Sequence, residues 1–246
     1  MSKRVAVVTG GVGGLGTAIC QALADAGCTV IAADLPPSAE HRAQFEAAMH
    51  GRDVRFAAVD VADHASCGGL ISSVQRECGS LDILVNNAGI TRDATLRKMD
   101  PAQWQAVIDV NLGGVYHMCR HAIEGMQARA FGRIVNISSI SGQTGNFGQT
   151  NYAAAKAGLH GFTMSLAREV AAKGITVNSI SPGYVETPMT RAMPPEVRAR
   201  TVASIPAGRI GDPADIARAV AFLCDDAASY ITGANLPVNG GLFMSF

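Results

Sequence analysis

The sequence TGGVGGLG, residues 9–16, separates the apolar run VAVV, residues 5–8, from the helical pattern TAICQALADAG, residues 17–27. Gly10, Gly14 and Gly16 have the spacing TGxxxGxG, which differs by one residue from the GxGxxG of many dinucleotide folds. Glycines let a backbone turn tightly and approach a pyrophosphate, whose charge then meets free N–H groups at a helix N-terminus. Many strand-to-helix turns contain glycine for packing alone, but the position between a first strand and a first helix favours a dinucleotide site.

Apolar, β-branched runs recur along the rest of the chain and alternate with segments long enough for helices. Runs that are apolar throughout are typical of strands buried on both faces, and strand–helix alternation requires crossover connections. We therefore expect an α/β fold of the Rossmann type: a doubly wound, parallel, seven-stranded sheet flanked by helices. The expected strands lie within RVAVVTG (4–10), CTVIAADL (28–35), VRFAAVDV (54–61), LDILVNNAG (81–89), GRIVNISS (132–139), GITVNSISPG (174–183) and ANLPVNGG (234–241).

The domain organisation follows from length and from the absence of a linker. We interpret residues 1–246 as one domain, because 246 residues can bury one large core and no linker-like stretch divides them. Pro101 after Asp100 and Pro213 after Asp212 indicate two helix starts. One long segment, residues 184–206, interrupts the alternation, and its length indicates that it covers a site rather than only connecting two elements.

Composition argues against several classes of partner. Twenty basic residues balance twenty acidic ones, and no Lys/Arg-rich stripe is present, so we expect neither a nucleic acid nor a membrane as partner. The N-terminal apolar run is too short for a signal peptide, and the six cysteines lack zinc-site spacing, which together favour a cytoplasmic protein. His117 and His121 could share a helical face, but without a third ligand we expect no metal.

Asp34 ends the second expected strand, about 20 residues beyond the glycines, where dinucleotide folds place the acid that bonds the adenosine ribose. A carboxylate there accepts hydrogen bonds from both ribose hydroxyls and repels a 2′-phosphate. Gly13 in the glycine turn offers no cation to such a phosphate. The sequence therefore predicts a preference for NAD (NADH) over NADP, although Asp34 could instead be a turn residue before Pro36, and Arg42 could still allow NADP.

The sequence NYAAAK, residues 151–156, places Tyr152 and Lys156 one helical turn apart on the same face. A phenol with a pKa of about 10 is a poor base at neutral pH, but a nearby ammonium favours the phenolate. Tyr152 could then give a proton to a carbonyl oxygen or take one from an alcohol. Ser139, thirteen residues earlier, could donate a hydrogen bond to the same oxygen, and Ser138 is the neighbour most easily mistaken for it.

Together, TGxxxGxG, NNAG (86–89), the serine of ISS (137–139), YxxxK (152–156) and PG (182–183) resemble the short-chain dehydrogenase/reductase family over essentially the whole chain. The resemblance implies the catalytic residues Asn111, Ser139, Tyr152 and Lys156, with Asn111 in a helix bend that holds a water. It further implies that Lys156 reaches the nicotinamide ribose. The residues it assigns to the dinucleotide are Gly10, Gly13, Gly14, Leu15, Gly16, Asp34, Asp60, Val61, Asn87, Ala88, Gly89, Tyr152, Lys156, Pro182, Gly183, Val185 and Thr187.

Longer segments, among them NNAGITRD (86–93) and SPGYVETPM (181–189), are most similar to the bacterial acetoacetyl-CoA reductases and 3-oxoacyl-acyl-carrier-protein reductases of that family. This similarity implies an NADH-preferring reductase that turns acetoacetyl-CoA into (R)-3-hydroxybutyryl-CoA, as in polyhydroxybutyrate synthesis, and a homotetramer whose interfaces include the C-terminal NGGLFMSF. Two departures stand out: members usually prefer NADPH, and Asn146 replaces a longer side chain. The alternatives are a carrier-protein reductase, a dehydrogenase of another small secondary alcohol, and a non-catalytic dinucleotide sensor. The implied substrate-binding residues are Ser139, Asn146, Phe147, Gln149, Tyr152 and Tyr184, with Arg92 and Arg191 as weaker candidates for the CoA phosphates.

Overall fold

The computed structural model describes residues 3–191 and 193–244. Its strands form one parallel sheet in the order β3-β2-β1-β4-β5-β6-β7, which confirms the predicted seven-stranded Rossmann-type sheet. All seven predicted apolar runs contain a strand. The strands are β1 (Val5–Thr9), β2 (Thr29–Asp34), β3 (Val54–Ala58), β4 (Ile83–Asn86), β5 (Gly132–Ile137), β6 (Ile175–Pro182) and β7 (Asn235–Val238).

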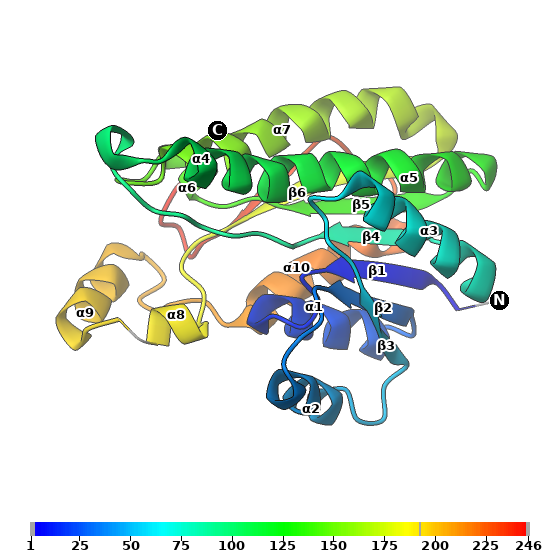
Figure 1. Cartoon of the computed structure of the whole chain (residues 1–246), viewed down its shortest axis with the longest axis horizontal. Helices are drawn as coiled ribbons and strands as arrows, with labels where there is room; N and C mark the ends of the chain where they lie inside the picture. Colours follow the sequence, from blue (N-terminus) through cyan, green and yellow to red (C-terminus); the bar gives the residue numbers. More distant parts are fainter. Residues whose placement is uncertain (1–2, 192, 245–246) are drawn as a thin grey trace.

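Helices cover both faces of the sheet (Figure 1). On one face lie α3 (His64–Cys78), α4 (Pro101–Ile108), α5 (Gly114–Ala128) and α7 (Thr150–Val170), and on the other α1 (Gly14–Asp25), α2 (Ala39–Ala48) and α10 (Pro213–Cys224). Successive residues of a strand point to opposite faces. In β1, accordingly, Val5 and Val7 belong to the apolar core under α3, α5 and α7, while Ala6 and Val8 belong to the core under α1 and α10.

The edge strands differ from the expectation that every run is buried on both faces. The central strands β1, β4, β5 and β6 are buried along their whole length, whereas β3 and β7 are partly exposed. The reason is their position, because each edge strand has a neighbour on only one side. Apolar composition alone therefore identified the strands but not their burial.

Both predicted helix starts occur at the expected residues. Asp100 and Asp212 accept hydrogen bonds from the first turns of α4 and α10, each helix has proline at its first position, and both form capping boxes. The five cysteines Cys20, Cys28, Cys67, Cys119 and Cys224 are buried, and no disulfide joins cysteines within the described part of the chain. No helix among the described residues is long and apolar enough to cross a membrane.

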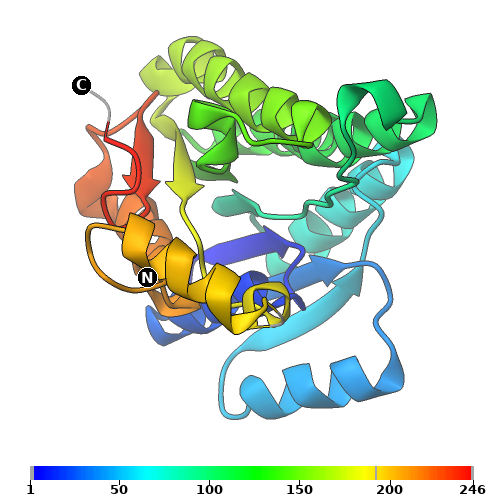
Figure 2. The ribbon, with the colours of Figure 1, turned by 90° about the vertical axis from the view of Figure 1, so that its left-hand side faces the viewer.

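The segment predicted to cover a site contains two helices, α8 (Pro188–Arg191) and α9 (Pro195–Ser204), and Ala192 between them lies outside the described residues. Both helices stand apart from the layered body in Figure 1, and Figure 2 shows α9 in front of the sheet. In a doubly wound sheet, ligands bind beyond the carboxyl ends of strands where the strand order reverses. Here that point lies between β1 and β4, which are neighbours in the sheet.

Candidate active site

A cleft of about 990 Å³ opens at this reversal point, beyond the carboxyl ends of the central strands. Every residue predicted to bind the dinucleotide lines it, from the glycine turn through the ends of β2 to β6. It is also lined by Ser139, Tyr152 and Lys156 and by four residues at or near the substrate-covering segment: Tyr184, Thr187, Thr190 and Ser204. The topology thus brings together residues as far apart in the chain as Gly10 and Leu242.

The glycine turn packs too tightly for side chains. Gly10 has φ of +62°, and a β-carbon on Gly16 would lie 2.0 Å from the Gly10 carbonyl oxygen. Asn87, at the end of β4, donates from its amide to the carbonyl oxygens of Thr9 and Gly10 at 3.0 and 3.1 Å. This interaction fixes the turn against the next strand and leaves the N-terminus of α1 facing the cleft, where a pyrophosphate would fit.

Asp34 lies at the end of β2, and both of its oxygens accept hydrogen bonds from backbone. Oδ2 accepts from Val12 N at 3.1 Å and Oδ1 from Leu35 N at 2.9 Å. Asp34 therefore combines the two sequence-based interpretations, since it stabilises its own turn and also faces the cleft. A carboxylate has further acceptor sites after two such bonds. Asp60, at the end of the third run, accepts from Ala62 N at 2.9 Å and lines the same end of the cleft.

Lys156 is buried in α7, and its ammonium donates to the carbonyl oxygen of Ile137 at 2.8 Å. Burial lowers the pKa of Lys156 to about 8, because desolvation disfavours the charged form. The close approach of the helix has a structural cause: a β-carbon on Gly142 would lie 2.7 Å from the backbone of Lys156. The ionisable amine of Lys156 is thus held in a buried position that borders the cleft.

The expected lowering of the Tyr152 pKa does not occur in the protein alone. Burial raises the pKa of Tyr152, the Ser139 hydroxyl beside it acts in the opposite direction, and Asp93 adds to the rise. The Lys156 ammonium lies 5.6 Å from the centre of the tyrosine ring and donates to Ile137 instead. Desolvation is the largest influence, and it holds the pKa of the Tyr152 phenol above its ordinary value.

Asn111 lies in a π-helical segment, Asp109–Gly113, that joins α4 to α5. Such a segment is the bend implied by the family resemblance, and π-bulges often mark functional sites. The Asn111 side chain is fully buried and donates to the carbonyl oxygens of Ile90 and Val107, both at 2.9 Å. Its Oδ1 has no hydrogen-bond partner among the described residues. A buried oxygen without a partner needs a donor, and a water is the simplest one.

The two adjacent serines both line the cleft, but their hydroxyls have different hydrogen-bond partners. Ser139 lines the cleft and its hydroxyl accepts from Ser141 N at 3.1 Å. The Ser138 side chain packs beneath α7, where its hydroxyl donates to the Lys156 carbonyl oxygen at 2.8 Å and lies 2.9 Å from Nε2 of His160. Because the Ser138 hydrogen is used on Lys156, His160 Nε2 must be the donor in the second contact.

The predicted acyl-pocket residues do not all reach the cleft. Asn146, Gln149 and Tyr184 line it, and Asn146 Nδ2 donates to Gln149 Oε1 at 3.0 Å. Phe147, in contrast, is 90% exposed and does not line the cleft, contrary to our expectation. Its loop is flanked by Gly145 and Gly148, whose positive φ angles form a tight surface turn that directs residue 147 outward.

Sequence reasoning did not identify two polar residues next to the site. Asp93 accepts from Gln149 Nε2 at 2.9 Å and acts on the pKa of Tyr152, and half-buried His160 supports Ser138 from behind. Asp93 carries no motif of its own, although it lies only four residues beyond NNAG. His160 is one helical turn after Lys156, so its shared face with the lysine was a usable signal.

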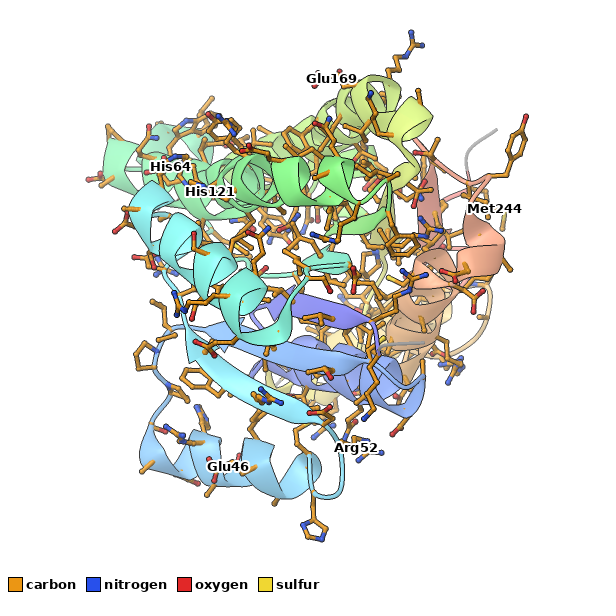
Figure 3. All side chains as sticks on the ribbon, turned by 90° about the vertical axis from the view of Figure 1, so that its right-hand side faces the viewer. Glu46, Arg52, His64, His121, Glu169 and Met244 are labelled. Atoms are coloured by element: carbon orange, nitrogen blue, oxygen red, sulfur yellow. The ribbon has the colours of Figure 1, made fainter. Side chains whose placement is uncertain are left out.

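Of the two weaker candidates for the CoA phosphates, Arg92 lines the cleft and Arg191 pairs with Glu186. His117 and His121 form a cluster with His64, and Figure 3 shows His64 and His121 next to each other. The ring centres of these two lie 4.3 Å apart. Residues 3–191 and 193–244 contain no group of three or more His, Cys, Asp or Glu side chains that could hold a metal ion.

The residues present fit a nicotinamide dinucleotide. The turn around Gly10 has no room for side chains and leaves its backbone open to a pyrophosphate. The Asp34 carboxylate lines the cleft at the position from which an acid hydrogen-bonds the adenosine ribose in dinucleotide folds. At the other end, Lys156 and the oxygen of Asn111 approach the same position beside Gly89. A β-carbon on Gly89 would lie 2.6 Å from Asn111 Oδ1 and 3.5 Å from Lys156 Nζ.

A parallel sheet with this strand order, a glycine turn after β1 and a Ser–Tyr–Lys set beside the cleft define a short-chain dehydrogenase/reductase. The family model described as enoyl-(acyl carrier protein) reductase matches residues 11–243, and the chain belongs to this short-chain dehydrogenase/reductase family. It is therefore an oxidoreductase that acts on CH–OH groups, and such enzymes generally use NAD or NADP.

Several characterised proteins are similar over nearly the full length. The chain is 53% identical to an acetoacetyl-CoA reductase of Allochromatium vinosum over 98% of this chain and 99% of that one. It is 50% identical to an acetoacetyl-CoA reductase of Cupriavidus necator (99% and 100% covered) and 46% identical to a 3-oxoacyl-[acyl-carrier-protein] reductase of Vibrio harveyi (99% and 99%). The crystal structure of gox2181 superposes with a TM-score of 0.92 at 38% identity and covers 98% of this chain and 96% of that one.

Proposed function

We propose that the protein is an NADH-preferring reductase of short-chain 3-oxoacyl thioesters that converts acetoacetyl-CoA into (R)-3-hydroxybutyryl-CoA. The observation that carries the proposal is the convergence of Ser139, Tyr152 and Lys156 on one cleft with the glycine turn. The relatives named acetoacetyl-CoA reductase support the thioester substrate. The Asp34 carboxylate in the cleft supports the preference for NADH.

In this proposal the chain's residues handle the proton and the developing charge, and the bound dinucleotide supplies the hydride. Ser139 and Tyr152 donate hydrogen bonds to the ketone oxygen, and the Tyr152 hydroxyl passes its proton to that oxygen as the carbon is reduced. Its raised pKa keeps the phenol protonated before the reaction. Lys156, with the positive charge of the oxidised dinucleotide, stabilises the phenolate that remains.

Reprotonation of Tyr152 is assigned to a water on the unpartnered oxygen of Asn111. This oxygen and the Lys156 ammonium both border the position beside Gly89, so a water there would join the lysine to solvent. Tyr184, Asn146 and Gln149 are proposed to bind the acyl chain, and residues 184–206 to cover it. We also propose a homotetramer that uses the C-terminal NGGLFMSF, whose last two residues lie outside the described residues.

The direct test is the rate of acetoacetyl-CoA reduction measured separately with NADH and with NADPH. The proposal expects turnover with NADH and a higher kcat/KM with NADH than with NADPH. The corresponding acyl-carrier-protein thioester and free acetoacetate distinguish the two enzyme alternatives, since preference for either would replace the CoA thioester as substrate. No turnover of any of these compounds would argue for another alcohol substrate or for a dinucleotide sensor.

A further inference from the structure

Helix α9 is joined to the rest of the protein mainly through polar groups. Helix α9 buries none of its described residues, although Ser204 at its end lines the cleft. Apolar burial is the usual source of helix docking, so a helix without it depends on a small number of directional contacts. Burial fixes the two ends of the cover, at Thr190 and at Ile205, so the orientation of α9 between these ends needs a further explanation.

Glu186 makes ion pairs with both helices. Its Oε1 accepts a charge-assisted hydrogen bond from Nη2 of Arg198 in α9, and its Oε2 lies 3.8 Å from Nε of Arg191 in α8. The Glu186 side chain is only 21% exposed, whereas Arg191 is 70% exposed and Arg198 is 39% exposed. One carboxylate thus joins two helices that have no other ion pair to the body among the described residues.

The backbone on which Glu186 stands is itself fixed to the body. Glu186 N donates to the Gly211 carbonyl oxygen at 2.8 Å, Gly211 N donates to the Tyr184 carbonyl oxygen at 2.9 Å, and Val185 pairs with Gly211 as a parallel bridge. Residue 186 therefore stands on backbone that is fixed to the body, and α8 is fixed to the same segment because the Thr190 hydroxyl donates to the Val185 carbonyl oxygen at 2.9 Å. A carboxylate at this position can transmit a fixed orientation to both helices that follow.

We propose that Glu186 is a positioning residue that holds α8 and α9 over the cleft through Arg191 and Arg198. Its carboxylate pairs with Arg191 and Arg198, so we expect it to act on substrate binding through the position of the two helices rather than on proton transfer. The dependence on ion pairs makes the position of the cover sensitive to salt, because the Debye length falls from about 10 Å at 0.1 M to about 3 Å at 1 M. This inference rests on the proposed function only where substrate turnover is the readout.

The test compares Glu186→Gln with Glu186→Asp and with Glu169→Gln, a matched charge change on the exposed face of α7. Glu169 forms no ion pair among the described residues. Trypsin cleavage after Arg198 and Arg200, followed by mass spectrometry, reports opening of α9 without any substrate. Glu186→Gln should raise that cleavage rate about fivefold, Glu186→Asp less, and Glu169→Gln not at all.

Steady-state kinetics supply the second readout. Glu186→Gln should raise KM for acetoacetyl-CoA about fivefold at low salt and leave kcat within about twofold, and its KM should respond less to 1 M NaCl than the parent's. An unchanged cleavage rate overturns the proposed tie between the helices. Faster cleavage with unchanged KM overturns its role in substrate binding. If the parent protein fails to reduce acetoacetyl-CoA, the proposed function is wrong. The proteolysis result still tests whether Glu186 holds α8 and α9 in place.

Discussion

A β-carbon on Gly89 would lie 2.6 Å from the side-chain oxygen of Asn111, so glycine at residue 89 leaves that oxygen room. Asn111 cannot easily yield, because its amide donates to two backbone carbonyls. Gly89→Ala should therefore destabilise the protein by about 1–3 kcal/mol through overpacking and remove most activity. Thermal or urea unfolding and the acetoacetyl-CoA assay measure the two effects.

Gly69→Ala is the matched control for this change. Gly69 lies inside α3, is exposed, and a β-carbon there would meet no atom within 4 Å. Alanine is favoured over glycine in a helix interior, so this variant should gain about 1 kcal/mol of stability with unchanged activity. If Gly89→Ala behaved like Gly69→Ala in both assays, the crowded arrangement of Gly89, Asn111 and Lys156 would not matter for the reaction.

The buried lysine predicts a pH dependence of the reduction. With a pKa of about 8, Lys156 is mostly protonated at pH 7 and loses its charge as the pH rises through 8. A neutral lysine no longer stabilises the tyrosine phenolate, so kcat should fall above pH 8 at saturating NADH and acetoacetyl-CoA. An arginine keeps its charge, so a slower Lys156→Arg variant should lack this decline. A parent profile that stays flat to pH 9.5 would count against the assigned role.

The strand pattern and the glycine turn were readable from the sequence because they depend on local chemistry. Apolar runs identified all seven strands, and the reversal of strand order then explains why the ends of β1 and β4 meet at the cleft. The orientation of side chains in the loops was less predictable. Phe147 follows the same segment as Asn146, yet the positive-φ glycines around it turn its side chain to solvent.

The directions of the pKa shifts of Tyr152 and Lys156 also could not be predicted from the sequence. Helical spacing placed Tyr152 and Lys156 on one face, but it could not reveal that burial would raise one pKa and lower the other. Desolvation depends on everything that packs around a side chain, and the charge of Asp93, from a distant segment, adds to the rise in the pKa of Tyr152. The choice of Ser139 over Ser138, in contrast, followed from the family resemblance, which assigns the role to the serine thirteen residues before the tyrosine.

Asp34→Asn tests the basis of cofactor preference. Asparagine keeps an oxygen acceptor for Val12 N but removes the negative charge that would repel a 2′-phosphate. The ratio of kcat/KM with NADH to that with NADPH should fall about tenfold, as expected for one partly screened charge pair. The ratio is measured at fixed acetoacetyl-CoA with each cofactor varied. An unchanged ratio would show that another residue sets the preference.

The central claim is that Tyr152 transfers the proton in a reductase of 3-oxoacyl thioesters, and Tyr152→Phe removes only the hydroxyl that does so. The account predicts that kcat for acetoacetyl-CoA reduction with NADH falls by about 10³-fold, while the Kd of NADH, followed by its fluorescence, stays within about twofold of the parent. A Tyr152→Phe variant that reduces acetoacetyl-CoA at close to the parent rate would contradict the account.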